Sequence, residues 1–319
     1  MNSSKKILLV GLGGIGCRYD FDNHSFAEIN RQSETKTHYG AGIQNNHEFI
    51  GGVDINPIAR QIFENFTSLR TWSSIKEIKN FTEVDILVIS TSTASHLQQI
   101  QEACNMIKPK AILCEKPFGR FAQDSLQMIE ISEQLQIPIL VNYSRNFSKG
   151  FRTISNVVGT KSIESGFVRY SQGLRVNGSH FLRFVIELLG VPKRVSFDSK
   201  NYKSQNPSFT LYYSNNKEIE FSGSDSKTIR LGEILLETDS STVKITEGMQ
   251  FEVRKVDEIL KPTPWFKDLK LIDQGDLSGG MNELYRDTKW MDKDNFSLSI
   301  ERNYRDHACN EIMDNLLSA

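Results

Sequence analysis

The sequence predicts an α/β protein in which a doubly wound parallel sheet precedes an α+β domain built on an open, mainly antiparallel sheet. Within residues 7–142, short apolar runs alternate with amphipathic stretches, which is the pattern of βαβ units. After about residue 143, longer strand-like segments follow one another with few helical stretches between them. We therefore expect two domains, with residues 1–142 in the first and residues 143–319 in the second.

The first domain is predicted to contain five strands and three helices. The runs at 84–90 and 111–115 are almost continuously apolar, which is typical of parallel strands covered on both faces. The expected strands are 6–10, 48–54, 84–90, 111–115 and 137–142, and the expected helices are 57–66, 94–107 and 121–135.

The second domain is predicted to bind substrate and to carry the contacts between subunits. Its segment 178–190 has apolar residues at helical spacing and ends at a glycine. Residues 262–295 are rich in Asp, Lys and Gly, which indicates a long excursion or two short helices. The expected strand regions are 162–171, 193–200, 208–222 and 229–256, and a last helix at 301–317 is a candidate to pack back on the first domain.

The composition excludes several classes of protein. The 38 basic and 39 acidic side chains give a net charge of −1, which favours neither nucleic acid nor an anionic membrane as a partner. No apolar stretch approaches the roughly 20 residues of a membrane span, and the apolar run near the start is too short for a signal-peptide core. The four cysteines are scattered, which indicates reduced thiols in a cytoplasmic protein and no metal site.

A glycine motif directly follows the first strand. Residues Gly11, Gly13, Gly14, Ile15 and Gly16 belong to a G-x-G-x-x-G pattern. The first glycine permits a tight turn, the second lets the backbone approach a pyrophosphate, and the third allows close packing of helix and strand. The following helix start presents N–H groups to phosphates. The pattern predicts a dinucleotide-binding Rossmann domain.

The second strand ends in an acid, Asp54, followed by Ile55. A carboxylate there accepts hydrogen bonds from the adenosine ribose and repels the extra phosphate of NADP. No Arg or Lys occupies the next two positions, so NAD is favoured and NADP is less favoured. The alternative interpretation is that Asp54 only begins a turn before the next helix.

The distance between the glycines and this acid is unusual. Gly16 and Asp54 are 38 positions apart (54 minus 16), whereas the usual spacing is about 20. We expect an insertion within residues 18–38, which is polar and includes Asp20. The insertion either covers the pyrophosphate edge of the cofactor or forms a surface excursion.

Three further motifs occur in order after the glycines. Thr91, Ser92 and His96 lie where a strand ends and a helix begins, Glu115-Lys116-Pro117 ends the next strand, and Asn177 precedes His180 at the start of the amphipathic helix. Together these motifs resemble those of the Gfo/Idh/MocA family of NAD(P)-dependent oxidoreductases, and the resemblance spans nearly the whole chain.

The resemblance implies a substrate lying between the open sheet and the nicotinamide. It implies that Lys116 and His180 are the catalytic residues and also contact the substrate, and that the Lys116–Pro117 bond is cis. It further implies cofactor contacts from Thr91, Ser92, Glu115 and Lys116. For His96, contact with the cofactor and packing against the sheet are both open.

The residue types suit the oxidation of an alcohol. That reaction sends a hydride to the nicotinamide and a proton to a base. Histidine has an ordinary pKa of about 6.5 and serves in either direction. The pKa of lysine begins near about 10.4, and burial beside the positive nicotinamide ring would lower it.

Three positions depart from the family pattern, and the first is Ser92, which stands where relatives carry the proline of a Thr-Pro pair at the nicotinamide edge. Many relatives carry acids four residues before and three residues after the histidine, where this chain has Val176 and Arg183. Asn177 or Ser179 would then partly replace the missing carboxylate by hydrogen bonding. These departures suggest a separate branch in which Lys116 is the chief proton donor.

Several other residues are candidates for substrate binding. Tyr143 and Arg145 follow the last strand of the first domain, and the alternatives for them are hinge packing and a solvated charge. Three arginines surround the His180 segment and either hold an anionic part of the substrate or form separate salt bridges. They are Arg169, Arg175 and Arg183.

The sequence therefore predicts an NAD-dependent oxidoreductase that acts on a ring hydroxyl or ketone of a sugar, cyclitol or nucleotide-linked sugar. The alternatives are an enzyme that uses tightly held NAD in a transient redox step and a non-catalytic NAD-binding regulatory protein. By analogy with the family, we expect a homodimer or homotetramer.

Overall fold

The chain divides into two compact units. Unit 1 comprises Met1–Ser144 and Gly279–Asn310, and unit 2 comprises Arg145–Ser278 and Glu311–Ala319. The last helix, α10 (Phe296–Ser318), therefore contributes to both units. The computed structural model describes residues 3–22, 29, 35–79, 83–158, 163–197, 204–226, 228–246, 249–256 and 269–318.

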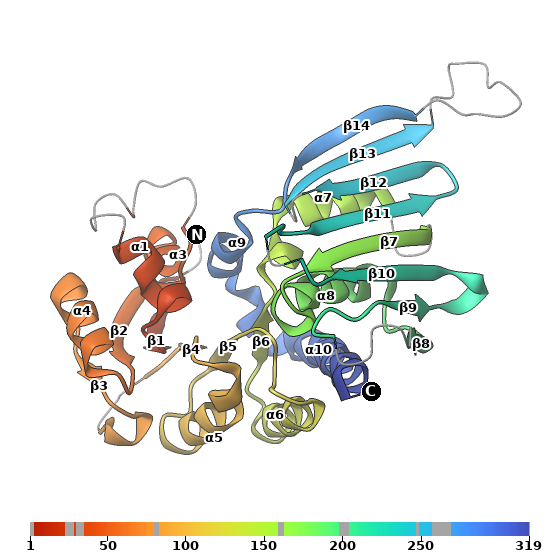
Figure 1. Cartoon of the computed structure of the whole chain (residues 1–319). Coiled ribbons are helices and arrows are strands. Elements are labelled where there is room, and N and C mark those ends of the chain that lie inside the picture. The colour runs from red at the N-terminus through yellow and green to blue at the C-terminus, as the bar shows by residue number, and fades with distance from the viewer. Residues whose placement is uncertain are drawn as a thin grey trace, which may run out of the picture. The chain divides into compact units, whose positions relative to one another are not determined.

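Unit 1 is built on a six-stranded sheet in the order β3-β2-β1-β4-β5-β6, and every neighbouring pair is parallel (Figure 1). The order reverses between β1 and β4, which is the topological switch point of a doubly wound sheet. Its strands are β1 (Lys6–Val10), β2 (Glu48–Val53), β3 (Thr71–Trp72), β4 (Ile86–Ile89), β5 (Ala111–Glu115) and β6 (Ile139–Asn142). The five predicted strands are confirmed, and the two-residue β3 was not predicted.

Helices flank this sheet. Figure 1 shows α5 and α6 side by side, and the two helices contact each other. Helix α4 begins where Asn56 accepts a hydrogen bond from the Ile58 N–H at 2.9 Å, with Pro57 at the first helical position. The helices of unit 1 are α1 (Tyr19–Phe21), α3 (His38–Gln44), α4 (Pro57–Thr67), α5 (His96–Met106), α6 (Ala122–Leu135) and α9 (Gly280–Arg286).

Unit 2 is built on an eight-stranded sheet in the order β14-β13-β12-β11-β7-β10-β9-β8. All neighbours are antiparallel except β7 and β10, which are parallel. The mainly antiparallel sheet predicted for the second domain is therefore confirmed. Its strands are β7 (Ile163–Ser171), β8 (Arg194–Phe197), β9 (Phe209–Tyr212), β10 (Glu218–Ser224), β11 (Gly232–Thr238), β12 (Ser241–Thr246), β13 (Gln250–Val256) and β14 (Leu269–Asp276).

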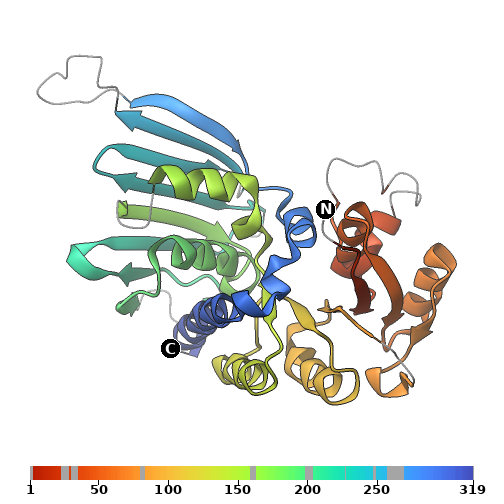
Figure 2. The ribbon, with the colours of Figure 1, turned by 180° about the vertical axis from the view of Figure 1, so that it is seen from behind.

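Helices α7 (Lys149–Val158) and α8 (Ser179–Leu189) lie on the same face of this sheet, in front of it in Figure 2. Helix α8 directs Phe181, Phe184, Val185 and Leu188 into the core of unit 2, because these positions share one side of the helix.

The structure differs from the predictions in two segments. Residues 229–256 form three strands in a meander instead of one region, and residues 269–276 form β14 where an excursion or short helices were expected. β14 is an edge strand whose side chains are nearly all exposed. Its charged residues, such as Lys270 and Asp273, and its apolar residues therefore do not follow the strict alternation of a half-buried strand. Residues 198–200 and 262–268 of the predicted segments lie outside the described residues.

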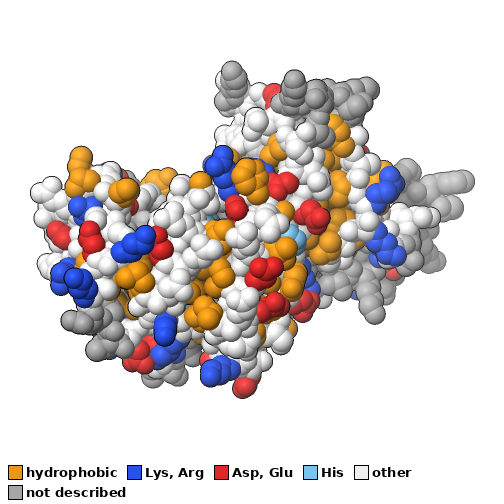
Figure 3. All heavy atoms as spheres, turned by 90° about the horizontal axis from the view of Figure 1, so that it is seen from below, with side chains coloured by type: hydrophobic (Ala, Val, Ile, Leu, Met, Phe, Trp, Pro, Cys, Tyr) orange, Lys and Arg blue, Asp and Glu red, His pale blue; other side chains and the backbone are white. Residues whose placement is uncertain are grey.

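Within the described ranges, no helix combines the length and apolarity that a membrane crossing requires. Figure 3 shows one face of the molecule, on which acidic and basic side chains both occur with apolar side chains between them.

Candidate active site

The glycine turn follows β1 and is closely packed at two positions. Gly11 has φ of +96°, and a Cβ added there would lie 2.6 Å from the backbone of Ser90. A Cβ on Gly16 would lie 2.2 Å from the Gly11 carbonyl oxygen. The Ser90 hydroxyl donates to that same oxygen at 2.7 Å. Glycine at these two positions is therefore required by the fold itself.

Gly13 has a different environment. It is exposed, and a Cβ added there would have no protein atom within 4 Å. Its φ of −83° is open to any residue, so neither local crowding nor backbone conformation requires a glycine. The open space at Gly13, which a side chain would fill, is called the Gly13 cradle. In this type of turn, a pyrophosphate approaches the backbone at that place. The neighbouring Gly14 lies under the Tyr19 ring, 2.5 Å from an added Cβ, and Ile15 is half-buried.

Asp54 follows β2 and is bonded to the glycine turn. Its Oδ2 accepts from the Leu12 N–H at 2.7 Å, and its Oδ1 accepts from the Asn56 N–H at 2.8 Å. Each carboxylate oxygen keeps a further lone pair for a ribose hydroxyl. Ile55 is 87% exposed beside it, which leaves an apolar surface suited to an adenine ring.

Arg60 was missed by the sequence analysis, which considered only the two positions after Asp54. The guanidinium reaches back from α4 and donates through Nη1 to the carbonyl oxygens of Asp54 at 2.7 Å and Ile55 at 3.1 Å. A cation therefore lies at the same turn as the Asp54 carboxylate. Helical spacing was the available signal, because Arg60 lies in the first turn of α4.

The turn after β4 contains Thr91, Ser92 and His96. Ser92 is exposed, whereas His96 is fully buried. The His96 ring lies with Nδ1 3.2 Å from the Phe118 carbonyl oxygen and Nε2 3.2 Å from that of Thr91. Burial lowers the pKa of His96 more than these hydrogen bonds raise it. His96 therefore ties the Thr91 and Phe118 loops together, which favours the packing interpretation for it.

Glu115 ends β5 and Lys116 follows it, and the Lys116–Pro117 bond is cis, as the resemblance implied. Glu115 is buried, and its Oε1 accepts from Asn142 Nδ2 at 2.6 Å and contacts His38 Nε2 at 2.9 Å. Its Oε2 accepts from the Lys116 backbone N–H at 3.3 Å. The Glu115 carboxylate therefore holds the backbone from which the half-buried Lys116 side chain projects.

A buried network extends from Glu115 to α9. His38 Nδ1 lies 2.9 Å from the Tyr285 hydroxyl, and both side chains are buried. Burial raises the pKa of Glu115, but the hydrogen bond and charge of His38 and the hydrogen bond of Asn142 outweigh it, so the net pKa is lowered. Burial and then the charge of Glu115 raise the pKa of Tyr285. Tyr285 is therefore a neutral hydroxyl, and Glu115 is an ionised acceptor.

His38, Asn142 and Tyr285 were not predicted as site residues. Asn142 had a usable signal, because it ends β6 beside β5 and the carboxyl ends of parallel strands meet at one sheet edge. His38 begins α3 at the end of the predicted insertion. Asp20 joins the two ends of that insertion by accepting from the Thr37 hydroxyl at 2.5 Å. Whether the insertion covers the cofactor depends on residues outside the described ranges.

In unit 2, His180 is half-buried at the second position of α8. The two residues expected to assist it are bonded elsewhere. Asn177 Nδ2 donates to the carbonyl oxygens of Ser171 and Leu231, both at 3.1 Å, and the Ser179 hydroxyl donates to that of Arg175 at 2.9 Å. Asn177 is also buried, so it fixes a loop beside the helix start.

Carboxylates lie against all three arginines near His180. Arg169 contacts Glu233 at 3.2 Å, Arg183 contacts Glu187 at 2.5 Å, and Arg175 pairs with Asp314. The structure therefore favours the salt-bridge interpretation, and the substrate contact predicted for Arg175 has no support from this geometry. Val176, which stands where many relatives carry an acid, is 63% exposed.

Tyr143 and Arg145 have distinct surroundings. Tyr143 is buried in the hydrophobic core of unit 1, which favours the hinge-packing interpretation for it. Arg145 is no solvated charge, because its guanidinium lies over the Phe181 ring, 4.9 Å from the ring centroid. Phe181 directly follows His180, so Arg145 lies beside the histidine segment.

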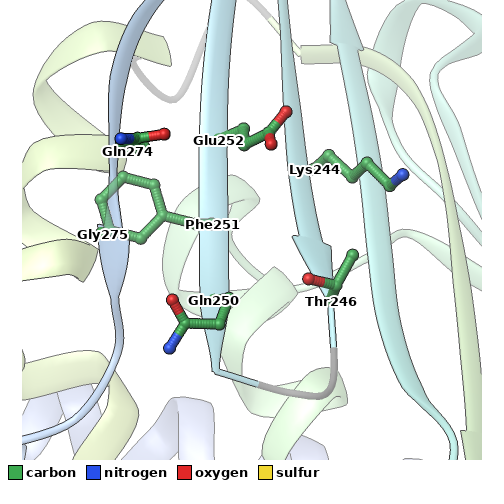
Figure 4. A pocket seen from close by; sticks show the side chains of 7 residues that line it. All are labelled: Lys244, Thr246, Gln250, Phe251, Glu252, Gln274 and Gly275. Carbon is green, nitrogen blue, oxygen red and sulfur yellow. The ribbon is translucent and has the colours of Figure 1, made fainter.

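A separate polar groove of about 400 Å³ lies on β12–β14 (Figure 4). Lys244, Glu252 and Gln274 stand in one cross-strand row, and Phe251 and Gly275 line the groove as well. None of the predicted site residues lines this groove.

The sheet order, the glycine turn and Asp54 define a dinucleotide-binding α/β protein. Residues 5–143 match the model of the Gfo/Idh/MocA family, described as an oxidoreductase family with an NAD-binding Rossmann fold. The match over residues 5–143 agrees with the family inferred from the motifs for that part of the chain, and it confirms the NAD-binding class of its fold. An uncharacterised oxidoreductase of Schizosaccharomyces pombe is 20% identical over 153 residues, which is 41% of this chain and 41% of that protein.

Solved structures share the fold of the whole chain. A UDP-N-acetylglucosamine 3-dehydrogenase from Acidithiobacillus ferrooxidans has a TM-score of 0.72 at 11% identity, covering 100% of this chain and 98% of its own. An Agrobacterium radiobacter oxidoreductase in complex with NAD⁺, L-tartaric acid and magnesium has a TM-score of 0.70 at 14% identity, covering 99% and 97%. The WlbA dehydrogenase of Bordetella pertussis, in complex with NADH and UDP-GlcNAcA, has a TM-score of 0.62 at 16% identity, covering 76% and 73%.

Proposed function

We propose that this oxidoreductase uses NAD to move a hydride to or from a ring carbon of a sugar, cyclitol or nucleotide-linked sugar. The observation that carries the proposal is the convergence, at the carboxyl edge of one parallel sheet, of the Gly13 cradle, Asp54 and the Glu115-bound Lys116. One protein of the same fold is a UDP-N-acetylglucosamine 3-dehydrogenase by name, and another is a dehydrogenase in complex with NADH and UDP-GlcNAcA, which supports the substrate class.

NAD fits the residues of unit 1. The open space at Gly13 suits the pyrophosphate, Asp54 has free lone pairs for the ribose, and the exposed Ile55 suits the adenine. Thr91 and Ser92 are proposed to line the nicotinamide side. When bound, NAD supplies the acceptor or donor of the hydride.

Lys116 and His180 are proposed to handle the proton. In the oxidation direction, the substrate C–H bond yields a hydride to the nicotinamide, the O–H bond yields a proton to a base, and a C=O bond forms. Lys116 Nζ is the chief candidate for this proton, because Glu115 holds its backbone and no carboxylate was found in the expected positions near His180. The imidazole of His180 is the second proton carrier.

The test is a hydride-transfer assay with NAD or NADH across sugars, sugar acids and UDP-sugars, following NADH absorbance. Lys116→Ala should lower kcat by about 10²-fold or more with a substrate that turns over. Lys149→Ala, an exposed lysine on α7, is the matched control. Full activity of Lys116→Ala would disprove the proton role. Copurified NAD without turnover of added NAD would favour the transient redox alternative.

We also propose that the protein is a homodimer or homotetramer that associates through the open face of its sheet. Leu235 lies on β11 in the interior of that sheet and is still 38% exposed. A second copy of the chain would cover it. Light scattering should give a mass of two or four chains, and Leu235→Lys should reduce it, whereas a single-chain mass for the unaltered protein would contradict this proposal.

A further inference from the structure

Arg145 is a half-buried cation whose Nη1 is a buried, unused donor. Its guanidinium packs over Phe181, and among the described residues no acceptor lies within hydrogen-bonding distance of its buried Nη1. Buried charges in proteins are ordinarily paired, because an unpaired one is costly to remove from water. The buried Arg183 of the same unit shows the usual arrangement, since its Nη1 contacts Glu187 at 2.5 Å.

A second cation lies close to Arg145. Burial, and then the positive charge of Arg230, lower the pKa of Arg145 to about 10. Arg230 is exposed, but its loop is firmly held. The Ser171 hydroxyl accepts from the Leu231 N–H at 2.8 Å and donates to the Ile229 carbonyl oxygen at 3.1 Å. The flanking bonds therefore fix the backbone of Arg230.

Both cations are positioned beside the helix start that carries His180. Asn177 donates to the Leu231 carbonyl oxygen at 3.1 Å, which attaches the Arg230 loop to the turn before α8. Arg145 lies over the residue immediately after His180. Two guanidinium groups of like charge repel each other in this position unless an anion lies between them. Arginine donors match the oxygens of a carboxylate or phosphate in fixed, often bidentate geometry.

We propose that Arg145 and Arg230 form an oxyanion site beside His180 that takes a carboxylate or phosphate group of the substrate. The inference rests on the proposed function, because it assigns an acidic class of substrate to that same site. It replaces Arg175, which pairs with Asp314, by Arg230, which the sequence analysis did not consider.

The test measures the midpoint of thermal unfolding during titration with malonate, as a carboxylate probe, or inorganic pyrophosphate, as a phosphate probe. Sodium chloride at matched ionic strength is the blank. Saturating NADH is present, because the glycine turn of unit 1 is a second place where phosphate binds. At least one probe should raise the midpoint saturably, and the effective probe identifies the chemistry of the anion.

Arg145→Met and Arg230→Gln should each weaken the response to that probe at least tenfold, while Arg169→Gln, a matched control with its own carboxylate partner, should respond normally. Without any probe, Arg145→Met should unfold no earlier than the unaltered protein, because an unpaired buried charge has been removed. If Arg145→Met does not fold, the exposed Arg230→Gln decides the result.

The inference is overturned if neither probe acts beyond sodium chloride, or if Arg145→Met and Arg230→Gln respond like the unaltered protein. NADH binding is measured first and separately. If NADH does not bind, the proposed cofactor is refuted, and the Arg145 and Arg230 variants still decide whether the anion site exists. A failure of the proposed function and a failure of the anion site are therefore distinguishable.

Discussion

His38 Nε2 lies 2.9 Å from Glu115 Oε1, in the interior of unit 1. Because an ionised carboxylate only accepts, His38 Nε2 carries a proton and donates to Glu115, and His38 Nδ1 lies 2.9 Å from the Tyr285 hydroxyl. His38 therefore connects the end of the insertion to the Glu-Lys-Pro turn. The end of the insertion therefore supports the backbone of Lys116 through Glu115.

His38→Phe should destabilise the protein by roughly 1–3 kcal/mol at pH 7, because the Tyr285 hydroxyl and Glu115 both lose a buried partner. In the unaltered protein the pKa of Glu115 is lowered, so its stabilising contribution is present above the unfolded pKa of about 4.3 and is lost as pH falls through the folded pKa. In His38→Phe, the hydrogen bond and charge of His38 no longer lower that pKa while burial still raises it, so the stability deficit of the variant should shrink on acidification. Urea unfolding of both proteins at pH 7 and at pH 4 measures the stability deficit of His38→Phe at each pH.

His38→Gln is the control for that experiment, because the amide retains an N–H donor toward Glu115 and should recover part of the lost stability. An equal deficit for both variants at both pH values would show that the His38–Glu115 bond does not set the ionisation of Glu115.

Substitution by alanine should affect the free energy of unfolding strongly at Gly11 and weakly at Gly13. Gly13→Ala should change the free energy of unfolding by no more than about 1 kcal/mol, because the new methyl group meets no protein atom and φ is unstrained. Gly11→Ala should be destabilised by more than about 1 kcal/mol, because φ is +96° and Ser90 lies in the way. Chemical denaturation tests the pair, and similar losses for both would contradict the assignment of Gly13 to a ligand.

Asp54→Asn should shift the ratio of NADPH to NADH affinity by about tenfold or more toward NADPH, since the carboxylate charge repels the extra phosphate. The amide oxygen can accept only one of the two backbone N–H groups that Asp54 accepts, so the turn keeps one of its two hydrogen bonds. Adding Arg60→Ala should remove part of the gain, because Arg60 lies at the same turn. Fluorescence titration with both nucleotides measures the ratio, and an unchanged ratio would remove Asp54 from the ribose site.

The fold followed from local patterns wherever strands are buried on both faces. The apolar run at Ile86–Ile89 and the glycines at 11–16 carry their own signals, since burial and tight packing restrict the residue type. The edge strand β14 was missed because its side chains face solvent on both sides, where charges and apolar residues are equally tolerated.

The site was predictable where a motif is contiguous and unpredictable where the fold assembles it. Glu115-Lys116-Pro117 is visible in the sequence, whereas Tyr285 reaches the network from a position 247 residues after His38. Arg145 was a candidate, but its partner Arg230 lies on a distant loop of unit 2 with no local pattern. Arginines near His180 in sequence turned out to have carboxylate partners.

The measurement that tests the central claim most directly is a titration of the purified protein with NADH, followed by nucleotide fluorescence, beside Gly13→Val. The account predicts saturable binding of one NADH per chain and a loss of affinity of at least tenfold in a Gly13→Val protein that remains folded by circular dichroism. Absence of NADH binding, or equal affinity in folded Gly13→Val, would contradict it.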